Sequence, residues 1–79
     1  MSPVPALELD CRALRCPLPV IELARHVGEV AVGQVVAVVA TDPAARHDVP
    51  AWCRMRGHRY RGEDRADDGA PRFSVERLA

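Results

Sequence analysis

Cys16 is the residue of this sequence best placed to do chemistry, because it lies within the run Leu14-Arg15-Cys16-Pro17-Leu18-Pro19. Prolines at these positions are typical of the first turn of a helix, where backbone amides have no partner inside the helix. The partial positive charge of a helix N-terminus lowers the pKa of a nearby thiol, and Arg12 and Arg15 add to it. The pattern predicts a low-pKa thiolate that attacks sulfur–sulfur bonds; the alternative is an inert cysteine at a strand–helix junction.

Two other cysteines, Cys11 and Cys53, could share this chemistry. Cys11 lies five residues before Cys16, and the two could form a reversible disulfide if their Cα atoms lay within about 7 Å of each other. We favour the alternative that Cys11 is a small apolar residue at the end of a strand, because strand-end and helix-start residues often point apart. Cys53 follows Trp52 and is predicted to belong to the core.

The histidines do not form a metal-binding pattern. His26, His47 and His58 lack the short spacings of zinc ligands, and no Cys-x-x-Cys pair accompanies them. We therefore expect neither a metal nor another cofactor.

The elements that position Cys16 follow from the spacing of apolar residues. Apolar and acidic side chains alternate over residues 6–10, which predicts a half-buried first strand. From Pro17 onward apolar residues recur every three or four positions, which predicts a helix of about three turns that ends at Gly28. The valine-rich run over residues 35–40 predicts a buried central strand.

The second half of the chain predicts one more helix and a hairpin. Helix-start signals occur at Asp42-Pro43 and again at Asp48-Val49-Pro50, so a start at Pro43 and a start at Asp48 are both open, and Gly57 ends the helix. Residues 58–61 and 72–78 predict two strands joined by a polar connection. The order β-α-β-α-β-β predicts a two-layer α/β sandwich, a mixed four-stranded sheet with both helices on one face and its first two strands parallel.

Length and charge limit the classes of function. The chain has 79 residues, enough for a single domain over residues 1–79, of which residues 1–5 are expected to be disordered. Eleven arginines balance 11 acidic residues, which argues against direct binding of nucleic acid.

The sequence contains neither an apolar run of about 20 residues nor a signal-peptide pattern. We therefore expect no membrane association and a cytoplasmic location. A local basic run is interpreted as solvated surface; it comprises Arg54, Arg56, Arg59, Arg61 and Arg65.

The stretch Leu9-Asp10-Cys11-Arg12-Ala13-Leu14-Arg15-Cys16-Pro17-Leu18-Pro19-Val20 resembles the Cys-Pro-x-Pro signature of the TusA/SirA family of small sulfur-carrier proteins. The later segments Asp42-Pro43-Ala44 and Asp48-Val49-Pro50-Ala51-Trp52-Cys53, followed by Gly57-His58, resemble the second block of that family. The resemblance covers nearly the whole chain in the right order. It also implies the same two-layer fold that the spacing predicts independently.

The resemblance implies a role in a sulfur relay. Cys16 would accept sulfane sulfur as a persulfide from a donor protein, such as a cysteine desulfurase or a rhodanese-like protein, and pass it to a downstream acceptor protein. Such a chain is a sulfurtransferase in the broad sense. The residues that the resemblance places in the supporting motif are Asp10, Arg12, Arg15, Pro17 and Pro19.

Two alternative functions stay open at this point. The chain could be a docking or regulatory module in which the Cys-Pro-x-Pro turn supports a surface and no sulfur moves. It could also be a thiol–disulfide redox protein that uses Cys11 and Cys16. One departure from the family pattern is Ala13, where glycine is common, and alanine is tolerable there unless the position requires positive φ.

Overall fold

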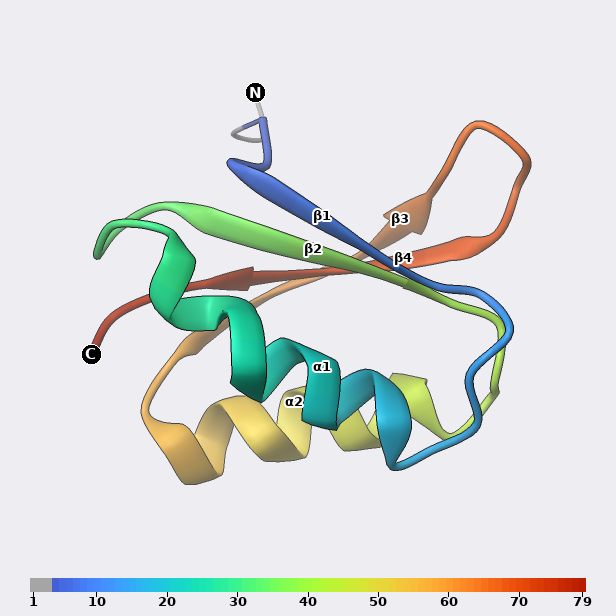
Figure 1. The fold of residues 1–79 in the computed structure, drawn as a ribbon, viewed down its shortest axis with the longest axis horizontal. Coiled ribbons are helices and arrows are strands. Elements are labelled where there is room, and N and C mark those ends of the chain that lie inside the picture. Colours follow the sequence, from blue (N-terminus) through green and yellow to red (C-terminus); the bar gives the residue numbers. More distant parts are fainter. Residues whose placement is uncertain (1–3) are drawn as a thin grey trace.

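The computed structural model describes residues 4–79. Its elements are, in chain order, β1 (Leu7–Cys11), α1 (Leu18–His26), the 3-10 turn η1 (Val27–Glu29), β2 (Val35–Ala40), α2 (Ala45–Arg56), β3 (Arg59–Arg65) and β4 (Pro71–Glu76) (Figure 1). The predicted order β-α-β-α-β-β is therefore confirmed. Of the N-terminal segment expected to be disordered, residues 1–3 lie outside the described residues.

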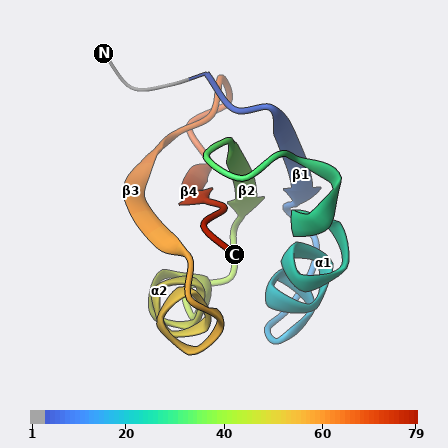
Figure 2. The ribbon, with the colours of Figure 1, turned by 90° about the vertical axis from the view of Figure 1, so that its left-hand side faces the viewer.

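The four strands form one mixed sheet in the order β1-β2-β4-β3. β1 runs parallel to β2, with Leu7 opposite Val36 and Cys11 opposite Ala40. β4 is antiparallel to both of its neighbours. Figure 2 shows α1 and α2 side by side on one side of this sheet. The predicted α/β sandwich with two helices on one face is confirmed.

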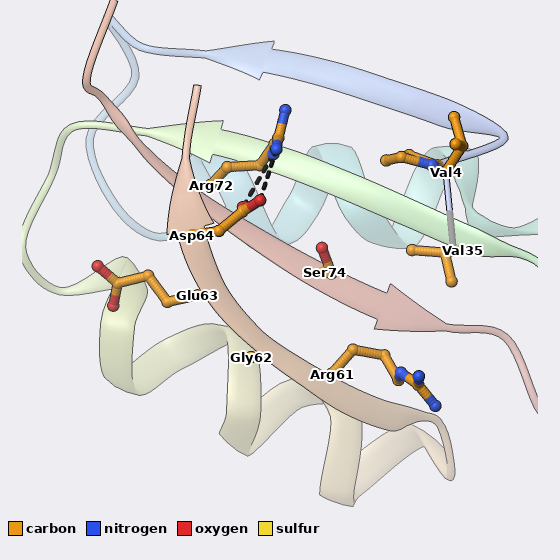
Figure 3. A pocket seen from close by; sticks show the side chains of 9 residues that line it. Val4, Val35, Arg61, Gly62, Glu63, Asp64, Arg72 and Ser74 are labelled. Carbon is orange, nitrogen blue, oxygen red and sulfur yellow. Dashed lines mark hydrogen bonds and ion pairs between the residues drawn. The ribbon is translucent and has the colours of Figure 1, made fainter. Parts of the chain in front are cut away.

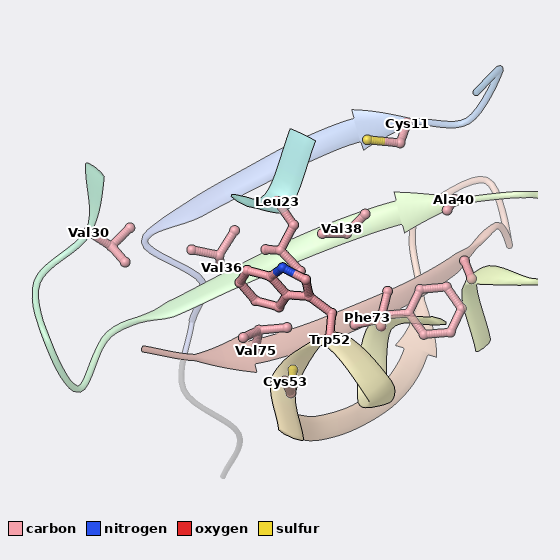
Figure 4. Packing of buried hydrophobic residues seen from close by; sticks show 12 residues of the cluster. Cys11, Leu23, Val30, Val36, Val38, Ala40, Trp52, Cys53, Phe73 and Val75 are labelled. Carbon is pink, nitrogen blue, oxygen red and sulfur yellow. The ribbon is translucent and has the colours of Figure 1, made fainter. Parts of the chain in front are cut away.

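The core lies between the sheet and the helices. β2 is buried over its whole length, as its valine-rich composition predicts. Val36 and Val38 face the helices, and Figure 4 shows Leu23 of α1, Trp52 of α2 and Phe73 of β4 meeting there. Both the sheet and the helices supply side chains to this one cluster. Detachment of either helix from the sheet would therefore expose apolar surface.

The face of the sheet without helices is covered by charged side chains instead. Side chains alternate across a strand, so Val35, Ala37 and Val39 point away from the helices, yet all three are buried. Arg72 pairs there with Glu8 at 3.3 Å and also with Asp64, and Arg61 pairs with Glu76 at 3.1 Å. The aliphatic stems of these long side chains shield the apolar stripe while their charged ends stay in water.

Several element boundaries differ from the predictions, among them the end of β4, which lies at Glu76 and not at Leu78. α2 begins at Ala45, close to the earlier of the two predicted starts, so Pro50 lies inside the helix. β3 continues to Arg65, four residues beyond its predicted end at Arg61. The register of β3 is irregular between Tyr60 and Gly62, and this break hides the alternation from a sequence pattern.

Other local predictions hold. Gly57 ends α2 with a φ of 78°, a value that glycine adopts without strain. Ala13 does not need a positive φ, because no residue other than glycine has positive φ within residues 4–79.

Within residues 4–79, neither α1 nor α2 is long and apolar enough to span a lipid bilayer.

Replacing Leu23 by alanine should lower the free energy of unfolding by about 2–5 kcal/mol, because the substitution leaves a cavity between α1 and the sheet. The matched control is Ile21→Ala on the same helix, where the side chain is 44% exposed and the expected loss is under about 1 kcal/mol. Urea denaturation followed by circular dichroism measures both variants. Equal losses in the two variants would contradict the proposed packing of α1.

His58 should make stability depend on pH. Its ring stacks on Trp52 at 5.2 Å between ring centroids, and its Nδ1 accepts a hydrogen bond from the Leu78 amide at 3.2 Å. Burial, and then the charges of Arg77 and Arg56, hold the pKa of His58 below its usual value near 6.5. The unfolded chain therefore binds more protons, and stability should fall as the pH drops below about 6.5.

The measurement is the urea midpoint between pH 7.5 and pH 5, compared for the wild type, His58→Gln and His47→Gln. His58→Gln should flatten this dependence, whereas substitution of the exposed His47 should leave it as in the wild type. An unchanged slope in His58→Gln would show that other groups cause the dependence.

Candidate functional site

Cys16 lies at the start of α1, in the loop that follows β1. Pro19 lies in the first turn of the helix, as the sequence predicts, whereas Pro17 is its N-cap residue and makes no side-chain capping hydrogen bond. The Cys16–Pro17 peptide bond is cis. The Cys16 side chain is partly exposed and packs against the edge of the core cluster. The thiol is thus held at the surface by a helix start that the local sequence specifies.

The loop after β2 lies against the loop that holds Cys16. β1 and β2 are parallel, so their carboxyl ends meet at the same edge of the sheet, as the blue and green loops at the right of Figure 1 show. Asp42 joins the two loops: one carboxylate oxygen accepts from the Cys16 amide at 2.9 Å, and the other accepts from the Ala44 amide at 2.9 Å. Thr41 adds a hydrogen bond from its hydroxyl to the Arg12 carbonyl.

The predicted low pKa of Cys16 is wrong. Burial, and then the carboxylates of Asp48 and Asp42, raise its pKa to about 11. The helix N-terminus does little to oppose them, because Pro17 and Pro19 carry no amide hydrogen and the Leu18 amide donates to the Arg15 carbonyl at 2.9 Å. In the described structure Cys16 is therefore a thiol.

Arg12 and Arg15, which were expected to favour a thiolate, interact with carboxylates instead. Arg12 contacts Asp10 and Asp68, at 2.9 Å each, and so links the end of β1 to the β3–β4 turn. Arg15 lowers the pKa of Asp42, and the Asp42 amide contacts lower it more. Of the predicted supporting residues, Asp10 and Arg12 thus bind each other in the loop that follows β1.

Cys11 and Cys53 are both part of the core. Each is 1% exposed, and burial is the main cause that raises the pKa of each thiol. Figure 4 shows Cys11 at the end of β1 inside the buried cluster, and all three cysteines are free. These positions favour the interpretation of Cys11 as a packing residue over its role in a redox pair. Within residues 4–79, no three potential metal ligands come together.

The surface around Cys16 is shallow and partly apolar. An open depression next to it is lined by the two loops, residues 12–15 and 41–43. On α1, Leu18 and Ile21 are 45% and 44% exposed, within the first turns after Cys16. Such a surface is better suited to contact with a protein than to enclosure of a small molecule.

A more enclosed groove of about 320 Å³ lies elsewhere, on the face of the sheet without helices (Figure 3). Val35, Ser74 and Gly62 line it, together with the ion pair between Arg72 and Asp64. Cys16 does not contribute to it. The groove therefore offers no enclosed pocket for chemistry at the thiol.

The carboxylates of Asp42 and Asp48 are not among the site residues that the sequence predicts. The sequence pattern marks both as helix-start signals, and Asp42 does bind the Ala44 amide as such a signal would. The available clue was topological: in parallel strands, the residues that follow the carboxyl ends gather at one edge, where sites commonly form. Asp42 follows β2 as the cysteine loop follows β1, and this relation places them together.

Comparison with known proteins gives consistent matches. The family model described as "Sulfurtransferase TusA" matches residues 7–77. A "Sulfur carrier protein TusA" of Pseudomonas entomophila is 47% identical over 55 residues, which are 70% of this chain and 69% of that protein. A "Putative sulfur carrier protein" of Archaeoglobus fulgidus is 33% identical over 69 residues, 87% of this chain and 90% of that protein.

A solved structure supports the fold. The crystal structure of a SirA-like protein from Desulfitobacterium hafniense superposes with a TM-score of 0.76, covering 92% of this chain and 99% of the other. The two sequences are 20% identical, so this match concerns the fold alone.

The raised pKa of Cys16 predicts a distinctive alkylation profile. The rate of reaction with iodoacetamide should still rise about tenfold per pH unit between pH 8 and pH 10, whereas an ordinary thiol with a pKa near 8.5 levels off over this range. Quenched samples analysed by peptide mass spectrometry assign the modification to Cys16. A plateau below pH 9 would contradict the described environment of the thiol.

Proposed function

Because the chain belongs to the TusA sulfurtransferase family, we propose that it is a sulfur carrier in a sulfur relay and that Cys16 carries the sulfur. The observation that carries the choice of residue is exposure: Cys16 is partly exposed, whereas Cys11 and Cys53 are 1% exposed. A sulfur atom must pass between two proteins, and only an accessible thiol can meet a donor's sulfur.

The proposed step is an exchange of sulfane sulfur. The Cys16 sulfur attacks the outer sulfur of a donor persulfide, a new sulfur–sulfur bond forms on Cys16, and the donor's sulfur–sulfur bond breaks. The donor cysteine leaves as a thiolate and takes up the proton that Cys16 has lost. No net oxidation occurs, so the step needs no electron acceptor and no cofactor.

The partners in this proposal are proteins. The donor would be a cysteine desulfurase or a rhodanese-like protein, and the acceptor a second protein of the relay. The exposed Leu18 and Ile21 close to Cys16 in the chain offer apolar contact area for such a partner, and an open depression lies between the two neighbouring loops. In this proposal the chain is a sulfurtransferase that can act stoichiometrically.

A docking module without sulfur transfer is the second candidate. The raised pKa of Cys16 favours a docking module, because a protonated thiol is a poor nucleophile. In a docking module, replacement of Cys16 by serine would leave binding and biological activity intact. In a carrier, the same substitution would abolish sulfur transfer.

The deciding experiment is intact-protein mass spectrometry after incubation of the reduced protein with a cysteine desulfurase and free cysteine. A carrier should gain the mass of one sulfur atom, and dithiothreitol should remove it. The Cys16→Ser variant should gain nothing. Cys11→Ala and Cys53→Ala are the matched controls and should gain sulfur as the wild type does, provided circular dichroism shows that they fold.

Failure of the wild type to gain sulfur from several active desulfurases and rhodaneses would count against the carrier. Sulfur on a variant that lacks Cys16 would move the carrying role to another residue. Loss of two hydrogens on mild oxidation, dependent on both Cys11 and Cys16, would instead support the redox pair.

A further inference from the structure

The loop from Arg12 to Cys16 is fastened to the loop after β2 at both of its ends. At its start, the Thr41 hydroxyl donates a hydrogen bond to the Arg12 carbonyl. At its end, the Cys16 amide donates to the Oδ2 atom of Asp42 at 2.9 Å. Thr41 and Asp42 are neighbours in the chain, so one short segment holds the cysteine loop at two points.

The start of this loop has further contacts that do not involve Asp42. The Nε atom of Arg12 donates to the Asp68 carboxylate at 2.9 Å, and its Nη1 atom contacts Asp10 at 2.9 Å. The Asp42 hydrogen bond, in contrast, acts on the backbone of Cys16 itself. Loss of the Asp42 carboxylate would therefore leave the start of the loop fixed and free the end that carries the thiol.

Asp42 divides its two carboxylate oxygens between two amides. Oδ1 accepts from the Ala44 amide at 2.9 Å, the local contact of an Asx turn before α2. Oδ2 accepts from the Cys16 amide, 26 positions away in the chain. The first contact is sufficient for the turn. The second joins α2's leading loop to Cys16, and a charged acceptor makes it a strong hydrogen bond.

We propose that Asp42 is a positioning residue, whose hydrogen bond to the Cys16 amide sets the direction in which the thiol meets a donor's sulfur. The proposal rests on the proposed function, because it concerns transfer at Cys16. A donor protein docked on the surface cannot reorient freely, so a displacement of the thiol by about 1 Å can slow the reaction about 100-fold. A small reagent approaches from any side and is not limited in this way.

The test uses two substitutions of Asp42 that differ in the contact they keep. Serine makes the same turn contact with the Ala44 amide through its hydroxyl, but lacks the second oxygen that binds the Cys16 amide. Alanine keeps neither contact. Amide hydrogen exchange followed by NMR should show the Cys16 amide exchanging about tenfold or more faster in both variants than in the wild type.

Sulfur loading by a cysteine desulfurase with free cysteine is then measured at several concentrations of the carrier. In both Asp42→Ser and Asp42→Ala, kcat should fall about tenfold or more while KM stays as in the wild type. Asp67→Ser, the same substitution in the exposed β3–β4 turn, is the matched control and should change neither value. Thermal denaturation shows which variants are folded.

Iodoacetamide alkylation of Cys16 separates position from reactivity. The negative charge of Asp42 contributes to the raised pKa of Cys16, so its removal should leave alkylation as fast as in the wild type or faster. Slow sulfur loading together with undiminished alkylation then reports a misplaced thiol and not a less reactive one.

Three outcomes would overturn the proposal. A rise in KM at unchanged kcat would assign Asp42 to the surface that binds the donor. Normal loading in Asp42→Ser with slow loading in Asp42→Ala would assign the effect to the turn before α2. Unchanged exchange of the Cys16 amide in both variants would show that the hydrogen bond does not hold the loop.

Failure of the carrier function would look different. If the wild type gains no sulfur from any donor, the proposed function fails, and the role of Asp42 in transfer fails with it. Normal loading of the wild type and of both Asp42 variants would leave the carrier intact and refute the positioning role alone.

Discussion

The parallel pairing of β1 with β2 is the constraint on which the site depends. Parallel strands end at the same edge of the sheet, so the loops that follow β1 and β2 must run side by side before each enters its helix. The Asp42 carboxylate then joins the two loops through the Cys16 and Ala44 amides. Loss of this pairing would separate the thiol from both carboxylates while leaving each local segment unchanged.

The pKa of Cys16 depends more on burial and on nearby carboxylates than on the helix N-terminus. A helix N-terminus stabilises negative charge by about 0.3–1 kcal/mol, through amide hydrogens that have no partner. At α1 two of the early positions are prolines, and the intervening amide is already bonded. Burial, and then the Asp48 and Asp42 carboxylates, raise the pKa of Cys16. These effects outweigh a partial positive charge that is largely missing at this helix start.

The same fold separates three cysteines into different roles. Cys11 and Cys53 lie on elements that face the core, so burial makes them packing residues. Cys16 lies in a loop at the sheet edge, where the chain turns from one layer to the other and cannot be fully covered. Exposed apolar side chains on α1 adjoin it, and the opposite face of the sheet is covered by ion pairs instead. The surface near the thiol is therefore suited to contact with a protein partner.

The sequence by itself determined the order of the elements, the central place of residues 35–40, and the helix start at the prolines that follow Cys16. These features depend on local patterns of burial and on backbone preferences, which neighbouring residues specify. The end of β3, the commitment of Arg12 to Asp68 and the raised pKa of Cys16 were decided only by the tertiary structure. Each depends on residues far apart in the chain, and a charge acts through distance in space, not through distance in sequence.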